Sequence, residues 1–147
     1  RYIACGGLNR QIALWDWKQK KATALVGHRK FVRCVAISPD GELVVSGADD
    51  GELLVWNFKS ETLIHRLSAH NGRVDVVAFS PDSTRFVTGG EDGVIKIWEA
   101  LAGRELYTLR GHDRGITHVA FVAQGQFLES ASLDNSFRLW RTATGAA

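Results

Sequence analysis

The sequence contains no methionine, only two cysteines and only two prolines among its 147 residues. Because it lacks methionine and begins with Arg1, we expect the chain to be processed or excised from a longer protein. Cys5 and Cys34 form no Cys-x-x-Cys motif, and an apolar content of 45% is enough to build a core without a disulfide. Both thiols are therefore expected to be reduced and packed in the interior.

Long apolar runs and a strong excess of charge are also missing. The longest unbroken apolar stretch runs from Val119 to Ala123, far short of the roughly 20 residues that a membrane span needs. No signal-peptide pattern and no Asn-x-Ser/Thr sequon is present. A formal net charge of only +2 argues against a concentrated basic arm of the kind that binds nucleic acid. No membrane span is expected, and these absences favour an intracellular location, in the cytoplasm or nucleus.

What the sequence does contain is a repeat, in which three residue types recur at the same spacing of 42 residues. Trp15 lies 41 residues before the first of these tryptophans, so a partial copy precedes three further copies. We predict a partial repeat over 1–26 and repeats over 27–68, 69–110 and 111–147. The recurring residues are His28, His70 and His112; Asp50, Asp92 and Asp134; and Trp56, Trp98 and Trp140.

Each copy has the pattern of four short strands joined by tight turns. Alternating or continuous apolar segments of five to seven residues are typical of strands buried in a sheet, and Pro and Gly mark the turns between them. Four such strands form a meander that is too small to bury its own faces. In the first full copy the expected strands are 31–37, 43–47, 52–56 and 62–67, with turns at 38–41 and 49–51.

These motifs together resemble the WD-repeat family. Each copy has Gly-His or Ala-His, a turn such as Ser38-Pro39-Asp40, a Ser-Gly-x-Asp-Asp-Gly segment or its variant, and a final Trp. The resemblance implies an all-β fold, a segment of a β-propeller built from four-stranded antiparallel blades, with about 3.5 repeats of about 42 residues. Departures are minor, such as Asn9 in place of the turn aspartate in the partial copy.

The resemblance also implies a buried polar network in each copy that runs from Trp through Ser or Thr to His and Asp. Such a network satisfies the indole donor, the hydroxyl and both imidazole nitrogens across three strands. Its expected members are His28, Ser46, Asp50 and Trp56; His70, Thr88, Asp92 and Trp98; and His112, Ser130, Asp134 and Trp140.

A set of Ser, His and Asp invites a catalytic reading, which we reject. The set recurs three times, whereas a nucleophile and its base are needed once, and a Trp would cover each hydroxyl. Asp49 and Asp50 form a possible metal pair, but a solvated turn is the better interpretation, and no Gly-rich phosphate loop is present. The sequence therefore predicts no enzyme, no catalytic residue, no cofactor and no metal.

Family propellers bind partners at the end of the ring that carries the His and Asp loops. By alignment, the exposed positions lie three and five residues after each His and directly before each turn Asp. Arginine and aromatic anchors among polar groups are typical of protein-recognition surfaces, so protein or peptide partners are expected. The positions are Phe31, Arg33 and Asp49; Arg73, Asp75 and Glu91; Gly115, Thr117 and Leu133; and Leu8 in the partial copy.

Two other functions stay open. A basic cluster at Lys18, Lys20, Lys21, Arg29, Lys30 and Arg33 could bind an anionic partner such as nucleic acid, although this is the less favoured reading. The chain could also be a regulatory or sensor segment of a larger multidomain protein. Because closed propellers need about 4–8 blades, self-association or further repeats are expected to complete the ring.

Overall fold

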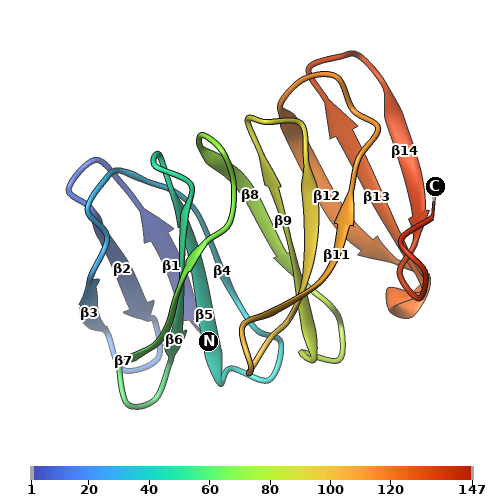
Figure 1. Cartoon of the computed structure of the whole chain (residues 1–147). Helices are drawn as coiled ribbons and strands as arrows, with labels where there is room; N and C mark the ends of the chain where they lie inside the picture. Colours follow the sequence, from blue (N-terminus) through green and yellow to red (C-terminus); the bar gives the residue numbers. More distant parts are fainter. Residues whose placement is uncertain (1, 147) are drawn as a thin grey trace.

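The computed structural model describes residues 2–146, which form 14 β-strands in four antiparallel sheets (Figure 1). The first sheet consists of β1 (Tyr2–Gly6), β2 (Gln11–Asp16) and β3 (Lys21–Val26). The second consists of β4 (Val32–Ile37), β5 (Leu43–Ala48), β6 (Glu52–Asn57) and β7 (Thr62–Ser68). The third consists of β8 (Val74–Phe79), β9 (Arg85–Gly90), β10 (Ile95–Glu99) and β11 (Arg104–Leu109). The last consists of β12 (Ile116–Val122), β13 (Phe127–Ser132) and β14 (Phe137–Arg141), with the short 3₁₀ turn η1 (Ala123–Gly125) between its first two strands.

Within each sheet, consecutive strands pair with each other, so every sheet is an up-and-down meander. The turn expected at 38–41 is present, and Gly41 has the positive φ of 74° that favours glycine. Ser38 closes this turn because its hydroxyl accepts the amide of Leu43 at 2.9 Å. The all-β fold, with antiparallel sheets of three or four strands like propeller blades, is confirmed.

The four sheets stand side by side in chain order, as Figure 1 shows from the blue N-terminal sheet to the red C-terminal one. The first strands of neighbouring sheets, β4, β8 and β12, lie next to one another, and β1 lies beside β4. The apolar core is therefore found between sheets and not within any one of them. One cluster around Val45, Phe86 and Trp98 joins the second and third sheets, and similar clusters fill the other two gaps.

The two outermost sheet faces remain exposed. Ile3 and Trp15 on the first sheet are 56% and 39% exposed, and Phe137 and Leu139 on the last are 85% and 53% exposed. Equivalent side chains on the middle sheets are buried because a neighbouring sheet covers them. The expectation that self-association or further repeats complete a ring stays a prediction.

The two thiols have different environments. Cys34 packs against the core, where burial raises its pKa to about 12 and its Sγ lies 3.4 Å from the Val74 carbonyl. Cys5 is exposed on the first sheet, so the expectation that both thiols are packed is wrong for Cys5. The reason is that Cys5 points to the face that no second sheet covers.

Candidate functional site

The third sheet contains a continuous polar chain. The Trp98 indole donates to Thr88 Oγ1 at 3.0 Å, and that oxygen lies 2.8 Å from His70 Nε2. His70 Nδ1 lies 3.1 Å from Asp92 Oδ1. With Nδ1 donating to the carboxylate, Nε2 accepts the threonine proton. Each of the four side chains in this series of hydrogen bonds is then satisfied.

The last sheet repeats this arrangement with one addition. Trp140 donates to Ser130 Oγ at 2.9 Å, Ser130 lies 2.8 Å from His112 Nε2, and His112 Nδ1 lies 3.0 Å from Asp134. The Ser136 hydroxyl also lies 3.0 Å from His112 Nδ1 and donates to Asp134 at 2.6 Å. This hydrogen bond is the largest cause that lowers the pKa of Asp134.

The second sheet departs from the expected set. His28 Nε2 lies 2.7 Å from Ser46, and Trp56 donates to Ser46 at 3.3 Å. The carboxylate that faces His28 Nδ1, at 3.4 Å, belongs to Glu52 and not to Asp50. The structure thus corrects the expected role of Asp50, whose Oδ1 instead accepts the backbone amide of Glu52 at 3.2 Å.

The residue two positions after the turn aspartate explains this difference. That position holds Glu52 in the second sheet, Val94 in the third and Ser136 in the last. Only Glu52 combines a carboxylate with enough length to reach the imidazole. Arg66 holds the other Glu52 oxygen and also donates to the Gly27 carbonyl at 2.9 Å, which fixes the acid beside the histidine.

The turn aspartates Asp92 and Asp50 are expected to contribute differently to stability. Asp92 accepts from His70 and from the backbone amides of Asn71 and Val94, at 3.0 and 3.1 Å for the two amides. We expect Asp92→Ala to lower the free energy of unfolding by about 2 kcal/mol, because it leaves a buried imidazole donor without its acceptor. Asp50→Ala is expected to lower the free energy of unfolding by about 0.5 kcal/mol, since among residues 2–146 Asp50 bonds only one exposed amide. Urea unfolding of both variants measures the difference, and equal losses would contradict the assignment of Glu52 as the partner of His28.

Burial makes two of these histidines sensitive to pH. Desolvation lowers the pKa of His28 and of His70 below the ordinary value of 6.5, against the opposing effect of the facing carboxylates. Between the lowered pKa and 6.5 the unfolded chain binds more protons, so stability falls as pH decreases below about 6.5. The slope is at most about 1.4 kcal/mol per pH unit for each histidine. Urea unfolding between pH 8 and 5 should show a shallower slope for His70→Gln than for the unaltered chain, and identical slopes would contradict this.

The hydroxyls of the three networks are buried inside the sheets. The three hydroxyls, of Ser46, Thr88 and Ser130, are at most 1% exposed. Each is in contact with both an indole and an imidazole, so a substrate has no route to it. Between residues 2 and 146, no three His, Cys, Asp or Glu side chains converge as metal ligands.

The other expected site residues lie at what we call the loop end. This is the end of the sheets formed by the β3–β4, β7–β8 and β11–β12 loops and by the β1–β2, β5–β6, β9–β10 and β13–β14 turns. A β-bulge in the first strand of each of three sheets takes Arg33, Asp75 and Thr117 out of the regular ladder. A bulge redirects a side chain, and these three point away from the core. Sequence reasoning treated this strand as regular and missed the bulge.

Backbone hydrogen bonds across each sheet fix the remaining loop-end positions. In all three cases the residue before the turn aspartate donates its amide to the carbonyl of the residue three after the histidine. The bonds join Asp49 to Phe31 at 3.0 Å, Glu91 to Arg73 at 2.9 Å and Leu133 to Gly115 at 3.0 Å. In the last of these pairs Leu133 is 57% exposed, as expected, whereas Gly115 is buried. The prediction that Gly115 is exposed is therefore wrong.

The loop end contains an open hollow of about 690 Å³ between the first and second sheets. Its lining includes Leu8, Phe31 and the pair formed by Arg33 and Asp49, in which Arg33 Nη2 donates to Oδ2 at 3.2 Å. This hydrogen bond raises the pKa of Arg33. Arg73 also lines the hollow, so five of the expected partner-binding positions meet here. Asp75 and Glu91 contact Arg73, at 3.2 and 3.6 Å, and extend the surface toward the third sheet.

The basic cluster expected from the sequence is divided by the fold. Arg29 and Lys30 lie in the β3–β4 loop and line the hollow at the loop end. Lys18 and Lys20 lie in the β2–β3 turn at the opposite end of the sheet. These residues therefore form two separate patches, because β3 crosses the full height of the sheet between them.

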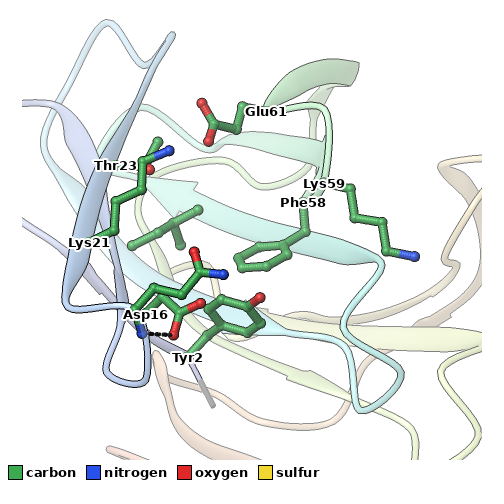
Figure 2. A pocket seen from close by; sticks show the side chains of 9 residues that line it. Tyr2, Asp16, Lys21, Thr23, Phe58, Lys59 and Glu61 are labelled. Atoms are coloured by element: carbon green, nitrogen blue, oxygen red, sulfur yellow. Dashed lines mark hydrogen bonds between the residues drawn. The ribbon is translucent and has the colours of Figure 1, made fainter.

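A second, smaller hollow of about 250 Å³ lies at that opposite end (Figure 2). Tyr2 and Phe58 meet edge to face in its wall, with ring centroids 4.3 Å apart. Two of its charged side chains have partners within the chain: Asp16 accepts the amides of Lys18 and Gln19 at 2.9 and 3.0 Å, and Lys59 pairs with Glu42. Sequence reasoning did not identify this hollow, because its lining comes from two different copies of the repeat.

Comparison with known proteins agrees with this geometry. The WD domain, G-beta repeat family matches residues 19–57, 61–99 and 103–141. Each match begins near the outer strand of one sheet and ends with the third strand of the next, so one sequence repeat links two neighbouring sheets. In the part of the chain that the structure describes, no helix is long and apolar enough to cross a bilayer.

Several curated proteins are similar over part of the chain. Small ribosomal subunit protein RACK1y of Oryza sativa subsp. japonica is 37% identical over 68 residues, which are 46% of this chain and 20% of that protein. Periodic tryptophan protein 2 of Arabidopsis thaliana is 38% identical over 65 residues, 44% of this chain and 7% of that protein. Nuclear distribution protein PAC1 of Gibberella zeae is 32% identical over 60 residues, 41% of this chain and 13% of that protein. The alignments thus span no more than a fifth of these relatives. The three family matches, which cover most of the sequence, and the four antiparallel sheets together show that the chain belongs to the WD domain, G-beta repeat family.

Proposed function

We propose that the chain is a non-catalytic scaffold that binds proteins or peptides through its loop end. The observation that supports this most directly is the open hollow in which exposed Phe31 and Leu8 lie beside arginines. Aromatic and arginine side chains surrounded by polar groups provide most of the binding energy in protein interfaces. Membership of a family that typically binds protein partners supports the same role.

The hollow at the opposite end supports this role less well. It has about one third of the volume, and its aromatic rings pack on each other. Lys59 beside it pairs with Glu42 at 2.5 Å. A partner there would have to replace these contacts, whereas Leu8 and Phe31 are 72% and 42% exposed at the loop end.

A regulatory or sensor segment of a larger protein is the second candidate. It is favoured by the length of the relatives, since the aligned segment of Periodic tryptophan protein 2 is only 7% of that protein. In that case the loop end supplies recognition and another part of the protein supplies the activity. The ribosomal and nuclear names of two relatives support an intracellular location, which is part of this proposal.

Peptide selection tests the proposed surface. A random dodecapeptide display library is selected on the chain, and the affinities of the enriched peptides are measured for two variants. Phe31→Ser should weaken binding at least tenfold, because it removes the apolar anchor from the hollow. Phe137→Ser, which removes an exposed phenylalanine from the outer face of the last sheet, should change affinity less than twofold. If Phe137→Ser abolishes binding and Phe31→Ser does not, the loop end is not the binding surface.

A further inference from the structure

We propose that the hollow at the loop end recognises an acidic protein segment that also carries an apolar side chain. This inference rests on the proposed function and adds the chemistry of the partner. It follows from the distribution of paired and unpaired charges in the lining, from the exposed apolar groups between them, and from the absence of a continuous basic track.

The lining has an excess of positive charge. Five basic residues and two acidic ones, Asp49 and Asp50, border the hollow, which leaves a formal excess of three positive charges. Two of the five bases are already neutralised from within the chain. Arg33 pairs with Asp49, and Arg73 contacts Asp75 at 3.2 Å and Glu91 at 3.6 Å.

The remaining three bases are Arg10, Arg29 and Lys30, and Asp50 is the one acid of the lining that no described base pairs with, which leaves two unbalanced positive charges. All three bases are exposed, and no hydrogen bond or ion pair joins their side chains to any residue between 2 and 146. They come from two separate connections, the β1–β2 turn and the β3–β4 loop. The Val32 amide donates to the Gly7 carbonyl at 3.2 Å and so holds these connections together. Like charges concentrated in a concave surface attract an anionic ligand, and carboxylates that arrive here would gain three unshared donors.

Apolar groups lie among these charges. Leu8 is 72% exposed and Phe31 is 42% exposed, and both line the hollow. The Phe31 carbonyl accepts the Asp49 amide at 3.0 Å, so the aromatic ring is carried on a fixed backbone. A ligand that is acidic and nothing more would leave this apolar surface in water. A segment with a Leu or Phe next to its acids covers both features.

The same features favour a protein segment over a nucleic acid. The Asp50 carboxylate in the lining would repel a phosphate backbone, whereas a peptide can place its acids away from it. A nucleic acid also needs a track of positive charge along its length. The track is interrupted, because Lys18 and Lys20 lie at the opposite end of the first sheet.

The experiment compares two charge reversals of equal size. The dodecapeptide library is selected separately on the unaltered chain, on the Arg29→Glu/Lys30→Glu variant and on the Lys18→Glu/Lys20→Glu variant. All four residues are exposed, and both variants change the net charge by the same amount. Enriched peptides are then synthesised with their acids intact and with Glu and Asp replaced by Gln and Asn, and their affinities are measured.

We expect peptides selected on the unaltered chain to be rich in Asp and Glu beside a Leu or Phe. Replacing their acids by amides, or using the Arg29→Glu/Lys30→Glu variant, should weaken binding at least tenfold. The Lys18→Glu/Lys20→Glu variant should retain binding within twofold. Equal losses in both variants would overturn the proposal, because they would indicate an effect of net charge alone.

Two further outcomes separate this inference from the proposed function. Peptides that need Phe31 but show no preference for acids would overturn the acidic partner and leave the loop end as the binding surface. A labelled 20-nucleotide single-stranded DNA that binds more tightly than any peptide, and loses binding in the Arg29→Glu/Lys30→Glu variant, would assign the hollow to nucleic acid. Failure to enrich any peptide that depends on the loop end would overturn both proposals.

Discussion

Replacing Trp98 with alanine should lower the free energy of unfolding by about 4 kcal/mol, one of the two largest effects we expect in this chain. Trp98 is 4% exposed and stacks on Phe86, with ring centroids 6.0 Å apart. It lies in the cluster between the second and third sheets, so the cavity would open where two sheets meet. The substitution also leaves the buried Thr88 hydroxyl without the donor that contacts it at 3.0 Å.

The matched control is Trp17→Ala. Trp17 is 53% exposed, and its ring contacts the Lys18 ammonium group at 5.7 Å to the centroid. Trp17→Ala should lower the free energy of unfolding by about 0.5 kcal/mol, because removing an exposed ring leaves no cavity. Urea unfolding followed by far-ultraviolet circular dichroism gives both values. If Trp98→Ala lowers the free energy of unfolding as little as Trp17→Ala does, the stability of the sheets does not depend on the packing between them.

The second large effect is expected at Gly51, in the turn between β5 and β6. Its φ is +79°, and an added Cβ would lie 2.0 Å from the His70 carbonyl oxygen and 2.9 Å from that of Gly72. These contacts are with backbone atoms, so the β7–β8 loop would have to move. The same loop is held by Gly51 itself, whose carbonyl accepts the Ala69 amide at 2.9 Å. We expect Gly51→Ala to lower the free energy of unfolding by at least about 3 kcal/mol.

Gly41→Ala separates backbone strain from collision. Gly41 has a similar φ of +74°, but an added Cβ there has no neighbour within 4 Å. Gly41→Ala should therefore lower the free energy of unfolding only by the cost of a left-handed backbone for an L residue, about 1–2 kcal/mol. If both variants lose the same stability, the close approach of Gly51 to the β7–β8 loop is not a feature of the folded chain.

Most of the fold can be predicted from the sequence because the same pattern of strands and turns recurs in three copies. A strand pattern in one copy is ambiguous, but His28, His70 and His112 at a constant spacing place each strand in the same position of its copy. The partial first copy follows the same rule. Asn9 Oδ1 accepts the Gln11 amide at 3.3 Å, as the turn aspartates do for their own neighbours, so an amide serves the turn as a carboxylate does.

What the sequence did not predict are differences between copies. The exchange of Asp50 for Glu52 at His28 depends on whether one longer side chain reaches the imidazole in three dimensions. Nothing in the spacing of residues reveals this, because both acids lie in the same turn. The family pattern alone therefore predicted Asp50, the turn aspartate, as the partner of His28.

Surface features were the hardest to predict. Arg29 and Lys18 lie close in sequence, and only the course of β3 shows that they belong to opposite ends of a sheet. The hollow at the loop end likewise depends on Arg10 of one copy and Arg73 of another meeting the loop that carries Phe31. Such a surface is formed by the packing of neighbouring sheets, which a single repeat does not encode.

The most direct test of binding at the loop end is to map where a selected dodecapeptide changes the backbone amide chemical shifts of the isotope-labelled chain. Our account predicts that the largest changes fall in residues 7–10, 28–33 and 49–51 and at Arg73, around the hollow. Changes concentrated in residues 16–21 and 58–61, at the opposite end, or in residues 137–139 on the outer face would contradict it.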